Sequence, residues 1–93
     1  MRTVLVPIGN PALSKHAIAS VLHEGVGPVS SAEYKDGFQH IYFYIPFVAE
    51  ECIDPKWSRR TMQKARKVLN RNGYEIRLLD SGDIQVIGKK VGL

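Results

Sequence analysis

Residues 56–71 repeat apolar side chains at the spacing of an amphipathic α-helix. When each residue is advanced by about 100° around a helix axis, one arc of about 140° collects an aromatic and aliphatic stripe. The stripe consists of Trp57, Thr61, Met62, Ala65, Val68 and Leu69. Polar and basic residues take the rest of the circumference. A helix with one apolar face buries that face against a second layer of structure, so this pattern predicts a layered fold.

The polar side of this helix is basic along its whole length. The stretch contains no acidic residue and seven basic ones, which are Lys56, Arg59, Arg60, Lys64, Arg66, Lys67 and Arg71. Solvated surface helices usually mix the two signs and gain pairs four residues apart, which this helix cannot do. Residues 1–54 hold three bases and six acids, whereas residues 55–93 hold ten bases and three acids. The positive charge therefore belongs to the C-terminal half and favours a polyanionic partner over an ordinary solvated helix.

The remaining elements are predicted from hydrophobic pattern and turn residues. We expect strands over residues 3–8, 40–47, 74–79 and 84–88, a first helix over 11–24, and a second over 55–72. Asn10 and Pro11 suit the start of the first helix, and Gly25 its end. Residues 25–37, with three glycines and a proline, predict a long flexible loop. The last two strands predict a β-hairpin around residues 80–83, with Ile76, Leu78, Ile84 and Val86 facing the core.

This β-α-β-α-β-β order predicts one α+β domain over residues 1–93. The economical architecture is a two-layer sandwich of a four-stranded sheet and two helices, with parallel neighbours joined by right-handed crossovers. Apolar residues make up 44% of the 93, which is enough for one core. The single cysteine, Cys52, excludes an internal disulfide framework and a cysteine-rich zinc site, so we expect a cytoplasmic protein. We expect neither a membrane span nor a signal peptide.

One part of the chain runs from Ser58 through Met62 and continues with Ala65, Leu69, the pair Gly73–Tyr74 and the hairpin after it. This part is similar to the recognition helix and wing of winged-helix DNA-binding domains. The resemblance covers about a third of the chain. It implies an alternative fold, a winged helix-turn-helix with an extra N-terminal strand, in which residues 47–53 form the preceding helix. Ser58, Arg59, Arg60, Lys64 and Lys67 would then face a major groove. Residues 80–83 with Arg77 and Lys89 would form the wing.

Two weaker resemblances concern the N-terminus and the element order. Residues 3–8 with Ser14 and Ala17 look like the opening of universal stress proteins. The aspartate of that family is replaced around Gly9 and Asn10, and no glycine-rich phosphate loop follows, so nucleotide binding is not implied. The order of elements is topologically similar to small nucleic-acid binders such as the Alba group. The short chain is also compatible with a viral or mobile-element protein.

We therefore expect a nucleic-acid-binding protein, with duplex DNA favoured over RNA and with no cofactor or metal. The expected contact residues are Lys56, Arg59, Arg60, Lys64, Lys67 and Arg71, with Arg77 and Lys89 from the hairpin. Most would contact phosphates, and Arg59 or Arg60 would reach a base edge. The alternative is a small protein-interaction module, an inhibitor or adaptor, whose basic helix docks an acidic partner.

Enzymatic activity is not expected. Glu50, Glu51 and Asp54 could hold a divalent ion for a nuclease, but three acids before a helix more often complement its dipole. Cys52 lies beside two carboxylates that disfavour its thiolate, which makes it a poor nucleophile. Tyr42 and Tyr44 alternate with Phe43 and could stack bases on an open sheet face. We expect instead that this strand is central and that its aromatic side chains belong to the core.

Overall fold

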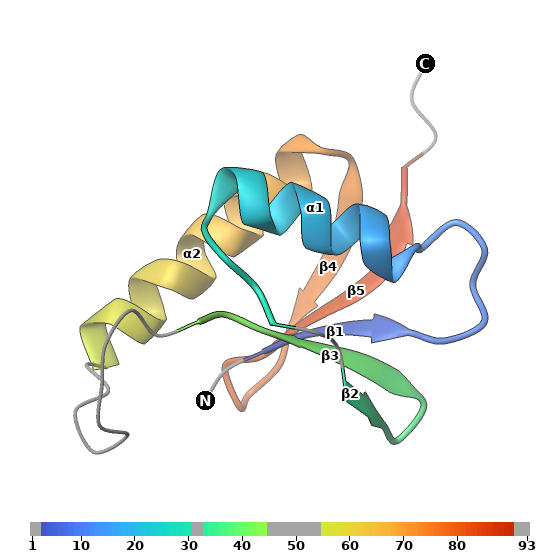
Figure 1. The fold of residues 1–93 in the computed structure, drawn as a ribbon, viewed down its shortest axis with the longest axis horizontal. Helices are drawn as coiled ribbons and strands as arrows, with labels where there is room; N and C mark the ends of the chain where they lie inside the picture. The colour runs from blue at the N-terminus through green and yellow to red at the C-terminus, as the bar shows by residue number, and fades with distance from the viewer. Residues whose placement is uncertain (1–2, 31–32, 45–54, 91–93) are drawn as a thin grey trace.

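A computed structural model describes residues 3–30, 33–44 and 55–90, with side chains from residue 57 onward in the last stretch. The described residues form two helices and a five-stranded sheet (Figure 1). The elements in chain order are β1 (Thr3–Pro7), α1 (Lys15–Gly25), β2 (Glu33–Lys35), β3 (Phe38–Tyr42), α2 (Pro55–Arg71), β4 (Tyr74–Leu78) and β5 (Ile84–Lys89). The expected α+β class is confirmed, whereas the four-stranded sheet was one strand short.

The additional strand is β2, which lies in the segment predicted as a loop. Its three residues are all exposed at the edge of the sheet, so no apolar alternation marks it. It joins β3 through Asp36 and Gly37, whose φ angles are +54° and +83°. Two consecutive left-handed residues form the tight turn that matches the twist of a hairpin, and the sequence Asp-Gly is typical of it. The Asp-Gly turn, rather than the pattern of the strand itself, could therefore have predicted this hairpin from the sequence.

The sheet has the order β2-β3-β1-β5-β4, with β1 at its centre. β1 runs antiparallel to β3 and parallel to β5, and β4 and β5 form an antiparallel hairpin. The expected parallel pairing of the first strand with the strand after the first helix is therefore wrong. The β2–β3 hairpin reverses the chain after α1, so that β3 returns beside β1 in the opposite direction.

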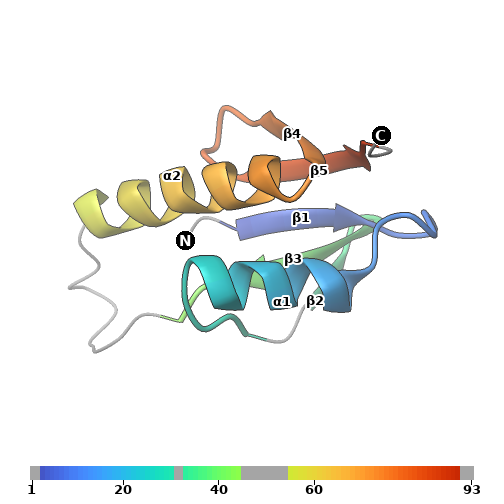
Figure 2. The same cartoon turned by 90° about the horizontal axis from the view of Figure 1, so that it is seen from above.

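Both helices cover the same face of the sheet (Figures 1 and 2). Val4 pairs with Ile41 on one side and Ile84 on the other, and all three side chains are fully buried. The helices contribute to the same core with Ile18, Leu22, Met62, Ala65 and Leu69. The two-layer sandwich is thus the observed arrangement. The hairpin is part of this sheet, since β5 pairs with β1 and Thr3 donates its backbone N–H to Asp83 Oδ1 over 2.7 Å.

Several element boundaries differ from the sequence prediction. The first helix begins at Lys15, because Ser14 is its N-cap and accepts a hydrogen bond from the Ala17 N–H. Asn10 instead accepts from the Ala12 N–H and closes a separate turn. The second predicted strand begins earlier, at Phe38, and ends earlier, at Tyr42, after which Phe43 forms only an isolated bridge to Val29. Its predicted residues 45–47 lie outside the described residues.

α2 and the hairpin agree closely with their predicted ranges. α2 ends at Arg71, and Gly73 follows at φ +85°, the left-handed conformation that commonly terminates helices. In the hairpin, Ile84 and Val86 are buried and Ile76 is partly buried. Leu78 was expected in the core, but it is 54% exposed.

Candidate nucleic-acid interface

The predicted apolar stripe of α2 is the face that packs on the rest of the protein. Ala65 and Leu69 are fully buried, and Met62 and Val68 are nearly so. α2 approaches α1 very closely at Gly25, where an added Cβ would lie 2.6 Å from Val68 Cγ2. The orientation of α2 about its own axis is therefore fixed by packing, and its opposite side is presented outward.

Six of the seven basic residues of α2 have described side chains, and all six are exposed. They are Arg59, Arg60, Lys64, Arg66, Lys67 and Arg71. Lys56 lies in α2, but its side chain is outside the described part. At 1.5 Å per residue, the stretch from Arg59 to Arg71 carries these cations along about 18 Å of the helix, without an acidic residue among them. The structure thus brings together the α2 members of the predicted contact set.

All but one of the six cations lie on two flanks of α2, and Lys67 lies on the polar ridge between the flanks. At 100° per residue, the direction opposite the buried arc falls on Gln63, Lys67 and Asn70. Arg60 and Lys64 line a pocket on the side of α1, whereas Arg59 and Arg66 line a second pocket beside the hairpin.

Three polar residues of this surface were missing from the sequence-based contact set. Gln63 and Asn70 are exposed, and their amides match the paired donor and acceptor of adenine in the major groove. Their position on the helical wheel could have identified them from the sequence, but the predicted contact set was chosen by charge alone. Arg66 was recognised as basic but not chosen, and the structure places it on the same flank as Arg59.

Arg77 and Lys89, the two hairpin residues of the predicted contact set, lie on opposite faces of the sheet. Arg77 pairs with Gln85 at a register position that alternates with the core residues Ile76 and Val86. It therefore lies on the sheet face that faces away from the helices. Lys89 is on the helix side, where its Nζ is 5.2 Å from the centre of the Tyr74 ring.

The sheet face away from the helices carries aromatic residues of its own. The rings of His40 and Tyr42 stack with centroids 6.4 Å apart, and the Tyr42 hydroxyl donates to Glu33 over 3.2 Å. Burial raises the pKa of the Tyr42 hydroxyl, and the hydrogen bond to Glu33 raises it further. The expectation of core burial is thus correct for Phe43 but wrong for Tyr42 and for Tyr44, which is 58% exposed. Because Tyr42 is engaged with a carboxylate, this face is a poorer site for a polyanion than α2.

The described residues contain neither a metal-ligand cluster nor a helix that could span a membrane. No cluster of three or more potential metal ligands occurs within residues 3–30, 33–44 and 57–90. Glu50, Glu51, Cys52 and Asp54 lie outside the described residues, as does the helix that the winged-helix resemblance implies over residues 47–53. Neither helix among the described elements has the length and hydropathy needed to cross a bilayer.

No protein-family model matches the chain, and no curated protein or solved structure matches it.

Proposed function

We propose that this protein binds nucleic acid through the outer face of α2, with duplex DNA as the preferred form. The observation that carries the proposal is a 17-residue helix with one side fixed in the core and six exposed cations on the other. Each cation that contacts a phosphate releases a counterion from the nucleic acid, and this release favours binding of the protein. The absence of acids from α2 leaves these cations available to an external anion.

The shape of the surface supports duplex DNA over RNA. α2 is a convex ridge, and the major groove of B-DNA is wide enough to admit a helix, whereas the major groove of A-form RNA is deep and narrow. Gln63 and Asn70 lie on the outermost line of the ridge, where base edges would be met first. Arg59 and Arg60, on the two flanks, are then placed for phosphates or for guanine at the groove edge.

The proposal is tested by fluorescence anisotropy with labelled duplex DNA, single-stranded DNA and duplex RNA over a series of salt concentrations. The expected result is tightest binding to duplex DNA, with log affinity falling linearly with log salt. An acidic protein or peptide of similar charge serves as the competing partner. If that competitor binds at low salt and the nucleic acids do not, α2 is an acidic-protein docking helix and the proposal fails.

A further inference from the structure

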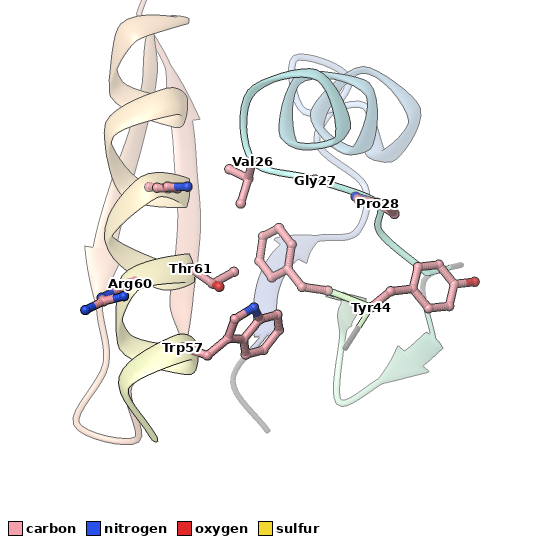
Figure 3. A pocket seen from close by; sticks show the side chains of 9 residues that line it. Val26, Gly27, Pro28, Tyr44, Trp57, Arg60 and Thr61 are labelled. Carbon is pink, nitrogen blue, oxygen red and sulfur yellow. The ribbon is translucent and has the colours of Figure 1, made fainter. Parts of the chain in front are cut away.

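A pocket opens beside α2 where three distant parts of the chain meet (Figure 3). Its volume is about 310 Å³, at the lower end of the range for small-molecule sites. The lining comes from the segment after α1, the two residues after β3 and α2 as far as Lys64, and consists of Val26, Gly27, Pro28, Phe43, Tyr44, Trp57, Arg60, Thr61 and Lys64.

Backbone hydrogen bonds hold the wall opposite α2 in place. The Val26 and Gly27 N–H groups both donate to the Leu22 carbonyl, which caps α1 and fixes the start of the wall. The Tyr44 N–H donates to the Pro28 carbonyl over 3.1 Å, which joins the segment after α1 to the segment after β3. The facing wall is α2, which is held at a fixed distance by its contact with α1. The pocket is therefore formed before any ligand arrives.

Aromatic side chains line the inner part of the pocket, and basic side chains stand at its solvent-exposed edge. Phe43 is buried, and Trp57 packs against the core with its indole directed from α2 toward the side of Tyr44 (Figure 3). The Thr61 hydroxyl and the Trp57 indole N–H are the polar groups among these inner side chains. Lys64 and Arg60 are both exposed lining residues, and the guanidinium of Arg60 projects to the outer side of α2, away from the opposite wall with Val26 and Tyr44 (Figure 3).

A ligand that matches this lining has a flat ring with hydrogen-bonding edges and an anion attached to it. A nucleobase with its phosphate has both parts, since bases stack on aromatic side chains and cations hold the backbone. The second pocket, on the hairpin side, has two arginines but aliphatic neighbours, Met62, Leu78 and Leu79, and offers no aromatic ring. The two flanks of α2 thus differ in what they can bind besides phosphate.

We propose that the pocket between α2 and the segment after α1 takes one unpaired nucleobase, with Lys64 at the pocket and Arg60 on the outer side of α2 binding the adjoining phosphates. This inference rests on the proposed function and deepens it, because it makes the preferred target a duplex that carries an unpaired nucleotide. Contacts between the outer ridge of α2 and the paired region bring the strand alongside the pocket. An unpaired base can enter the pocket without the free-energy cost of breaking a base pair, which a fully paired duplex would have to meet.

Trp57 is the only tryptophan in the chain, so its fluorescence reports on the pocket directly. The first probe is AMP, and ribose 5-phosphate is the control that has the phosphate but no base. We expect AMP at millimolar concentration to quench the emission and ribose 5-phosphate to leave it unchanged. The variant R60Q/K64Q should weaken the AMP response. The variant R59Q/R66Q removes the same charge from the other flank of α2 and should retain it.

The second measurement compares a paired DNA duplex with the same duplex carrying one unpaired adenine. We expect the unpaired base to improve affinity about tenfold, from one stacking contact on an aromatic ring, and W57L to abolish that preference while paired duplex still binds. Equal affinity for the two duplexes together with no AMP response overturns this inference and leaves the proposed function standing. Failure of both duplexes to bind overturns the proposed function, and an AMP response would then show a mononucleotide site.

Discussion

The number of cations on α2 sets a quantitative expectation for salt dependence. If the six exposed basic residues each neutralise one phosphate, log affinity should fall by about 0.9 per residue for each tenfold rise in salt. The triple variant R60Q/K64Q/K67Q should therefore flatten the slope by about 2.7. Fluorescence anisotropy with one duplex across a salt series measures both slopes.

The same substitutions should make the folded protein more stable. Arg60 and Lys64 are four residues apart, as are Lys67 and Arg71, and like charges at this spacing cost about 0.2–0.5 kcal/mol per pair. Glutamine keeps the helix propensity and removes both repulsions. The free energy of unfolding should rise by about 0.4–1 kcal/mol. The melting temperature should rise by a few degrees, since about 1 kcal/mol corresponds to about 4–8 °C in a domain of this size.

A matched control separates the α2 surface from net charge. The variant K15Q/K35Q/R77Q removes three positive charges from α1 and from the strands β2 and β4. Its salt slope should stay close to that of the parent protein. An unchanged slope in the α2 variant, or an equal loss in the control, would refute the assignment of binding to α2. A fall in the melting temperature of the α2 variant would refute the argument from repulsion.

Three further predictions concern the scaffold. Gly25→Ala should destabilise the protein by about 1–3 kcal/mol in urea unfolding, because the new methyl group meets Val68, and the double variant G25A/V68A should show less than the sum of the two single losses. Asp83→Ala should cost about 1–3 kcal/mol by removing the charged acceptor of the Thr3 N–H, whereas an unchanged unfolding midpoint would contradict that role. Tyr42 should ionise at higher pH than a free tyrosine in a 295 nm absorbance titration, because burial and its carboxylate neighbour raise its pKa. The unfolded chain then loses this proton first, so the stabilisation present below the ordinary tyrosine pKa should decline as pH rises through the higher pKa of the folded state.

The sequence predicted those elements whose residues carry their own periodicity. α2 was located to within one residue because its apolar stripe, its charge and its Asn72–Gly73 end agree. The hairpin was found from alternation around a polar turn. In both cases, the information lies within about twenty consecutive residues.

The errors arose where the outcome depends on distant partners. β2 has no apolar pattern because it is an exposed edge strand, and without β2 the direction of β3 was assigned incorrectly. The winged-helix resemblance put Arg77 in a wing beside α2, whereas strand alternation carries it to the sheet face away from the helices. The pocket beside Trp57 was not predictable from local pattern, since its lining spans residues 26–64.

The central position of β1 has a consequence for the order in which the molecule folds. β1 is hydrogen-bonded to β3 on one side and to β5 on the other, and Thr3 and Asp83 are 80 residues apart. The two parts of the sheet therefore remain separate until the first strand meets the last. Contacts of such long range slow the search for the native state. We expect α2, whose backbone hydrogen bonds are local, to form early and β1–β5 pairing to limit the rate of folding.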